Sequence, residues 1–153
     1  MKIAFSLQLP REEASVPLVR RICGDALDCL GVERACVEDI ELALTEACTN
    51  VLKHAVAPPS AYDVVVEINE RKCEIKVIDA GAGFDSSSSG GGFHTSGDPA
   101  EGGRGILIMQ SVVDDLKFTS EESVGSVVHL SKRLQFNDES LLKDLALQSR
   151  SNG

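Results

Sequence analysis

Residues 41–55 read Glu-Leu-Ala-Leu-Thr-Glu-Ala-Cys-Thr-Asn-Val-Leu-Lys-His-Ala, a stretch typical of an α-helix. Glu46, Asn50 and His54 follow one another at four-residue steps, so they share one side of that helix, and Lys53 lies beside them. A solvated helix face would explain such a line by itself, so the rest of the chain has to decide its role. Apolar residues at steps of three and four predict one buried stripe of Val37, Ile40, Leu44, Cys48 and Val51.

Strands are predicted on both sides of this helix, where apolar and polar residues alternate. A two-residue turn at 70–71 and a turn ending in Gly125 join two pairs of them into hairpins. The predicted strands cover residues 2–9, 62–69, 72–79, 115–120 and 125–133.

Three helices complete the predicted pattern. The first is expected to have Ser15 as its N-cap and to end at Gly31, and the second to run from Arg34 to Ala55. The third is expected to open at Gly103-Arg104-Gly105. The inward stripes are predicted to be Leu18, Ile22, Ala26 (or Cys23) and Leu30 in the first helix, and Ile106, Met109, Val112 and Val113 in the third.

The order of these elements predicts an α+β fold. Hairpins require a sheet that is at least partly antiparallel, and three amphipathic helices need one face of it to bury their stripes. We therefore expect a two-layer α/β sandwich, with a mixed, mostly antiparallel sheet and helices on one face. One domain is predicted over residues 1–136, followed by a short helix and a frayed tail over 137–153.

Composition narrows the classes of function. The chain has 153 residues, 42% of them hydrophobic, and a net charge of -9, from 15 basic against 24 acidic residues. Such an acidic chain is a poor match for a phosphate backbone, so we expect no nucleic-acid partner, whereas a basic protein surface would suit it. No apolar run approaches the length of a membrane span, and no membrane partner is expected.

Cysteine usage points to a reducing compartment. The five cysteines are odd in number and form no Cys-x-x-Cys motif, and most fall on predicted buried stripes. No signal peptide is visible at the first strand. We therefore expect reduced core thiols in a cytoplasmic protein.

Several common phosphate-binding and catalytic motifs are missing from the sequence. It contains no P-loop, no His-Glu-x-x-His and no protein-kinase signature. Gly81-x-Gly83 follows a strand, but no third glycine or helix start follows it, which argues against a dinucleotide fold. Glycines also stand where a calcium loop would need oxygen ligands.

Three short motifs are present in a specific order. Glu46-x-x-x-Asn50-x-x-Lys53-His54 lies on a helix, and Asp79-x-Gly81-x-Gly83 ends a strand. Gly103-x-Gly105 follows a serine- and glycine-rich stretch. Each motif alone is weak evidence, but their order, their spacing and the predicted elements around them form a specific combination.

In these motifs the sequence resembles the Bergerat-fold (GHKL) ATPases, which include gyrase B, Hsp90, MutL and histidine kinase ATPase domains. It is most similar to the stand-alone anti-sigma factor serine kinases, through Glu-Ala-Cys-Thr-Asn-Val-Leu-Lys-His-Ala and Gly-Gly-Arg-Gly-Ile-Leu-Ile-Met. The resemblance extends from the first strand to about residue 133. It implies an ATP site with Mg²⁺, closed by a lid over residues 86–102.

The resemblance assigns the chemistry to the long helix. It implies that Glu46 is the catalytic residue, which accepts or positions the proton of an attacking hydroxyl. Asn50 would bind nucleotide and hold Mg²⁺ through its amide oxygen. Lys53 would reach a phosphate.

The remaining implied residues bind nucleotide. Asp79 would accept a hydrogen bond from the adenine amino group, and Ser126 would lie near adenine where the family usually has threonine. Gly81 and Gly83 would let the backbone approach the base. The implied phosphate-binding segment is Gly103, Arg104, Gly105 and Ile106, through backbone amides and a helix N-terminus.

The function implied by the resemblance is that of a serine protein kinase and anti-sigma factor. The phosphate acceptor would be a serine of a STAS-type anti-sigma factor antagonist, and the second partner an RNA polymerase sigma factor. The family also implies a homodimer.

Two alternatives remain open at this point. A catalytically silent module could bind ATP and control a partner by nucleotide-gated binding, although Glu46 argues against it. A histidine kinase ATPase domain would need a phosphorylatable histidine on a dimerising helix, which it could meet only in trans.

Overall fold

The computed structural model describes residues 1–53, 61–79, 99–121 and 125–137. The five described strands and three described helices closely follow the predicted ones. They are β1 (Lys2–Pro10), α1 (Ser15–Cys29), α2 (Arg34–Lys53), β2 (Ala61–Asn69), β3 (Lys72–Asp79), α3 (Pro99–Val112), β4 (Asp115–Glu121) and β5 (Gly125–Arg133).

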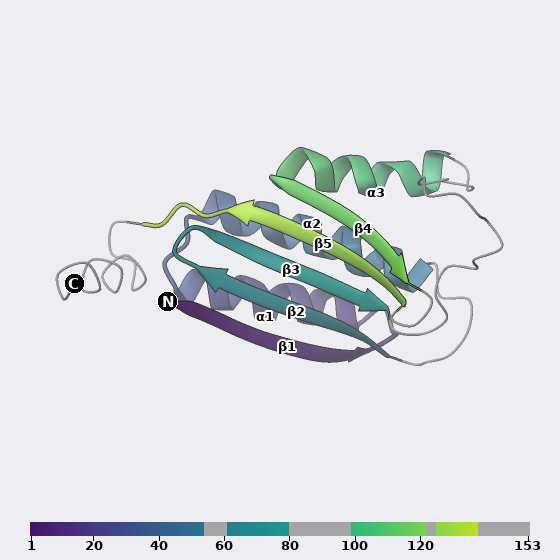
Figure 1. Ribbon diagram of the computed structural model, residues 1–153, viewed down its shortest axis with the longest axis horizontal. Coiled ribbons are helices and arrows are strands. Elements are labelled where there is room, and N and C mark those ends of the chain that lie inside the picture. The colour runs from purple at the N-terminus through teal and green to yellow at the C-terminus, as the bar shows by residue number, and fades with distance from the viewer. Residues whose placement is uncertain (54–60, 80–98, 122–124, 138–153) are drawn as a thin grey trace.

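The five strands form one sheet in the order β1-β2-β3-β5-β4. Every pairing between them is antiparallel, so the described sheet has no parallel pair. The helices form the second layer, with α2 between α1 and α3 (Figure 1). This architecture confirms the predicted two-layer α+β sandwich, although the described sheet is antiparallel throughout and not mixed.

The core lies between α1, α2 and the inner face of the sheet. Alternate residues of β2 and β3 face it, which is why these strands show a strict two-residue burial pattern. The stripe predicted for α2 is confirmed, since Val37, Ile40, Leu44, Cys48 and Val51 are all buried. Burial of this stripe fixes the rotation of α2 about its axis.

The stripe predicted for α1 is wrong in part, because Leu30 and the alternative Cys23 are buried but Ile22 and Ala26 are only partly so. Leu18 is 52% exposed, and the helix buries a neighbouring stripe of Val16, Val19, Cys23 and Leu27. Gly24 on this side is covered by the Glu41 carboxylate of α2, in space that a side chain at residue 24 would need. The side of α1 that carries Gly24 is therefore buried, because only there can α1 pack closely against α2.

The ends of α1 differ in how well they match the prediction. Ser15 is the first helical residue and not the N-cap, which is Ala14; the Ser15 hydroxyl instead donates to the Glu12 carbonyl at 2.7 Å. Gly31 follows the helix with φ 81°, and its N–H donates to the Asp28 carbonyl at 3.0 Å. This left-handed glycine confirms the predicted C-terminal stop.

The third helix begins earlier than predicted. It starts at Pro99, four residues before Gly103, so Gly103 and Gly105 lie in its second turn. Proline is favoured at the first helical position because its fixed φ suits a helix and its missing N–H is not needed there. The described part of the predicted lid, residues 99–102, is thus the first turn of α3.

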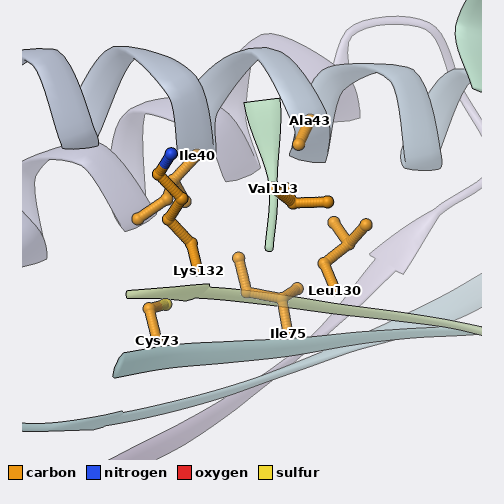
Figure 2. Close-up of a pocket in the computed structure, with 7 residues that line it drawn as sticks. All are labelled: Ile40, Ala43, Cys73, Ile75, Val113, Leu130 and Lys132. Carbon is orange, nitrogen blue, oxygen red and sulfur yellow. The ribbon is translucent and has the colours of Figure 1, made fainter. Parts of the chain in front are cut away.

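The α2 helix packs on β3 and β5 with little space between them. Figure 2 shows a small apolar cavity at this interface, about 10 Å³, lined by Ile40 and Ala43 from α2 and by Ile75 and Leu130 from the sheet. It is at the lower limit for a single water molecule. Lys132 runs beside it, and its Nζ lies 3.1 Å from Asp39 Oδ2.

After β5 the chain packs against the turn between α1 and α2. Phe136 forms an isolated antiparallel bridge with Val32, and the Asn137 N–H donates to the Gly31 carbonyl at 2.7 Å. The predicted tail helix lies outside the described residues. Among the helices of the described ranges, we find none with the length and apolar character needed to cross a bilayer.

Candidate active site

The α2 helix carries the two central residues of the site. Glu46 and Asn50 are partly buried and lie one turn apart, on the side next to the buried stripe. They are presented by a helix and not by a loop, so their backbone positions are fixed by the packing of the core. Lys53, the last residue of α2, is exposed.

Gly105 of α3 packs directly against these two side chains. A β-carbon at residue 105 would lie 2.9 Å from Glu46 Oε2 and 3.5 Å from Asn50 Oδ1. The first distance is too short for a real β-carbon and the second is ordinary van der Waals contact, so a side chain at residue 105 would have to displace the Glu46 carboxylate. The structure therefore brings together Glu46, Asn50 and Gly105, three residues that the sequence placed in two separate motifs.

The neighbours of Gly105 point in different directions. Arg104 is exposed, whereas Ile106 is partly buried and packs against the hydrophobic core. Met109, one turn on, is fully buried and anchors α3. The inward stripe predicted for α3 is thus confirmed, and Ile106 belongs to it.

Asp79 forms the second part of the site. It is the last residue of β3, is only 7% exposed, and lies on the inner face of the sheet. Ser126 of β5 is its direct partner across the strands, so the two side chains are neighbours. A buried carboxylate and a hydroxyl group therefore lie side by side at the end of β3.

Arg11 is a site residue that the sequence analysis did not identify. Its Nη2 donates to Asp79 Oδ1 in an ion pair, and both side chains are about nine-tenths buried. No motif surrounds Arg11, which lies in the loop after β1. Only the strand pairing, which aligns the ends of β1, β2 and β3, reveals that it lies near Asp79.

Lys53 is the last residue of α2. It lines a surface pocket of about 510 Å³ between the start of α1 and the end of α2. Arg11 lines the same pocket, whose other walls are Glu13, Val16, Pro17, Thr49 and Leu52. The exposed Lys53 and the buried Arg11 thus both lie on the side of α2 that faces α1.

Some of the predicted site lies outside the described residues. This applies to Gly81, Gly83 and His54, and to residues 86–98 of the predicted lid. Gly103 is described only as part of the α3 backbone.

The buried thiols of the core are not candidates for nucleophilic catalysis. Burial raises the pKa of Cys23, Cys48 and Cys73 to about 12, so these thiols stay protonated at neutral pH. All five cysteines are free, and Cys29 is the exposed one. Four of the five thiols are buried, as the sequence predicted for most of them.

Oxygen donors suited to Mg²⁺ are present at the Glu46–Asn50 pair. Mg²⁺ prefers oxygen ligands and usually keeps several of its waters, so one or two protein ligands are enough. Among the described residues there is no group of three or more His, Cys, Asp or Glu that could enclose a metal. The Asn50 amide oxygen fits such a lightly held ion.

Comparison with known proteins gives a family match. A family model described as a histidine kinase-like ATPase domain matches residues 9–132. The serine-protein kinase RsbW of Listeria monocytogenes is 32% identical over 132 residues, covering 81% of this chain and 84% of the relative. RsbW of Bacillus pumilus is 28% identical over 155 residues, covering 95% and 93%.

A solved structure supports the fold. The RsbU and RsbW domains of a Mycobacterium tuberculosis protein match with a TM-score of 0.66 at 17% identity. The match covers 86% of this chain and 32% of that chain. At this identity the likeness concerns the fold alone.

Proposed function

The chain belongs to the histidine kinase-like ATPase domain family and, within it, to the serine-protein kinases named RsbW, and from this membership we propose that it transfers the γ-phosphate of ATP to a serine of a partner protein. The contact of Gly105 with Glu46 and Asn50 is the observation that carries the proposal. At this contact the Glu46 carboxylate and the Asn50 carboxamide lie against the α3 backbone.

In this proposal Glu46 takes or positions the proton of the attacking serine hydroxyl. A carboxylate suits this role because it accepts hydrogen bonds only, and the core packing of α2 holds it in place. Lys53 and Arg104 are exposed and add positive charge for the phosphates. The backbone of Gly103, Gly105 and Ile106 approaches the phosphates from α3.

Asn50 is proposed to bind Mg²⁺ through Oδ1. When bound, the ion would neutralise negative charge on the phosphates. Asp79 and Ser126 are proposed to bind the adenine base, with Gly81 and Gly83 beside it. The burial of Asp79 supports this role, since a hydrogen bond to a carboxylate is stronger away from water.

We further propose that the acceptor is a STAS-type anti-sigma factor antagonist, and that the chain also binds an RNA polymerase sigma factor in the cytoplasm. The net charge of -9 supports a basic protein partner and not a nucleic acid. A homodimer is part of this proposal. Size-exclusion chromatography with light scattering tests it: a mass of 16.3 kDa, that of a single chain, would exclude the dimer.

Transfer of labelled phosphate tests the kinase proposal. The purified chain is incubated with γ-labelled ATP, Mg²⁺ and a lysate of its own host, beside Glu46→Gln and Asn50→Ala. Glu38→Gln is the matched control, because Glu38 lies on the same helix but is exposed near its start. We expect phosphoserine on a small protein with the wild type and the control only.

Two results would contradict the proposal. One is full labelling by Glu46→Gln, which would exclude Glu46 as the base. The other is tight binding of MgATP by the wild type without any labelled protein, which would leave a nucleotide-gated binding module.

A further inference from the structure

The ion pair of Arg11 and Asp79 joins two distant parts of the chain at the proposed base site. Arg11 follows β1, and Asp79 ends β3, on the same side of the molecule. The side chains are 10% and 9% exposed, so both charges are held away from water. Holding a guanidinium and a carboxylate away from water is costly, so a buried ion pair is weak evidence for a purely stabilising role.

The backbone around Arg11 is fixed by its neighbours. The Glu12 N–H donates to the Pro10 carbonyl at 2.8 Å, and the Ser15 hydroxyl donates to the Glu12 carbonyl at 2.7 Å. The Ser15 hydroxyl also lies 2.7 Å from the hydroxyl of Tyr62, which is 1% exposed. Arg11 is therefore presented from a turn that is anchored in the core.

The guanidinium of Arg11 has donors to spare. Within the described part of the chain, its Nε and Nη1 are buried and have no hydrogen-bond acceptor. Buried donors without a partner cost free energy, and native proteins rarely keep them unless a ligand or water completes them. Both donors are part of the guanidinium whose Nη2 donates to the Asp79 carboxylate.

We propose that Arg11 is a second base-reading residue, which donates to N1 of adenine while Asp79 accepts from the 6-amino group; this rests on the proposed function, in which Asp79 binds the base. Adenine presents a donor at position 6 and an acceptor at N1. The Asp79–Arg11 pair offers an acceptor and a donor to match. A 6-oxopurine presents the opposite order, so the pair selects adenine over guanine and hypoxanthine.

Nucleotide analogues test this assignment one atom at a time. 1-Deaza-ATP lacks the N1 acceptor, and purine riboside triphosphate lacks the 6-amino group. Competition against a fluorescent ATP analogue, with Mg²⁺ present, gives each affinity. We expect the wild type to bind each analogue about tenfold or more weakly than ATP, the loss of one charge-assisted hydrogen bond.

Substitution of Arg11 then separates base reading from a structural role. In Arg11→Met the preference for ATP over 1-deaza-ATP is expected to disappear. Arg11→Lys keeps a cation beside Asp79 but has no donors at the positions of Nε and Nη1, so the same preference should fall sharply. Arg34→Met, at an exposed arginine, is the control and should keep it.

Several outcomes would overturn the inference. Equal binding of ATP and 1-deaza-ATP by the wild type would exclude a reader of N1. An unchanged preference in Arg11→Met and Arg11→Lys, with all nucleotides weakened alike, would make Arg11 merely structural. Phosphate transfer by the wild type, measured in parallel, shows whether the kinase proposal stands when this inference fails.

Discussion

Gly105 of α3 lies against the Glu46 carboxylate of α2 so closely that a β-carbon would stand 2.9 Å from Oε2. The contact makes the position of Glu46 depend on the absence of a side chain one helix away. It also means that the smallest substitution at residue 105 acts on the proposed catalytic base and not on the hydrophobic core.

Gly105→Ala is therefore expected to separate activity from stability. Alanine favours a helix by about 1 kcal/mol over glycine, and the group it displaces is the flexible end of a side chain, so the free energy of unfolding should change by no more than about 1 kcal/mol. Phosphate transfer should fall at least about tenfold because Glu46 has to move. Urea unfolding and labelled transfer measure the two effects. Leu107→Ala, at an exposed α3 position, should change neither.

Tyr62→Phe should destabilise the fold modestly. The substitution removes the hydroxyl that lies 2.7 Å from Ser15 Oγ, while Ser15 keeps its bond to the Glu12 carbonyl. The expected loss in the free energy of unfolding is about 1 kcal/mol. Ser15→Ala, which also removes the bond to Glu12, should cost more. Urea unfolding of both variants tests the order, and a larger loss for Tyr62→Phe would contradict it.

Ala43→Leu should be destabilising, because the cavity beside Ala43 holds only about 10 Å³. A larger side chain there has to push α2 away from β3 and β5 (Figure 2). We expect a loss of about 1–3 kcal/mol in the free energy of unfolding and a slower transfer reaction, since Glu46 lies one turn further on. Thermal unfolding and labelled transfer test this. Leu42→Ala, at an exposed position, is the control.

Stability should fall at alkaline pH because of the buried thiols. Burial raises the pKa of Cys23, Cys48 and Cys73 from 9.0 to about 12. The stability that these buried thiols contribute is fully present below pH 9, where the thiols of the unfolded chain are also protonated. It is lost as the pH rises towards 12. Each thiol should lower the free energy of unfolding by about 1.4 kcal/mol per pH unit in this window.

Urea unfolding at pH 8, 9 and 10 measures this dependence. Cys73→Ala should reduce the slope by about one third, while lowering stability at every pH. Cys29→Ser, at the exposed cysteine, should leave the slope unchanged. A free energy of unfolding that stays constant from pH 8 to 10 would contradict the prediction.

The sequence predicted most element boundaries because alternation in strands is a local signal. It failed for the rotation of α1, where the stripe of Leu18 and the stripe of Val19 are both apolar. The choice between them depends on Gly24 packing against α2, which no local pattern contains. The predicted start of α3 was four residues late because Gly103 and Gly105 resemble a helix start, whereas the helix begins at Pro99.

The site was predictable where its residues share one element. Glu46 and Asn50 are four residues apart on a helix, so their proximity follows from helical geometry. Their contact with Gly105 agrees with the order of the motifs. The short distance between them depends on how α3 packs against α2, which the sequence pattern does not contain. Arg11 could not be found, because its partner is 68 residues away and only the sheet brings them together.

The strand order has a consequence for synthesis of the chain. The inner strand β3 pairs with β5 and not with β4, so its second edge stays open until residue 133 has been made. Until then, one edge of β3 in the nascent chain has unpaired backbone N–H and C=O groups. Such an exposed edge can pair with strands of other chains. The last strand to be made is the one that closes this edge and delivers Ser126 to Asp79. Translation therefore ends the exposure of β3 and completes the proposed base site in one event.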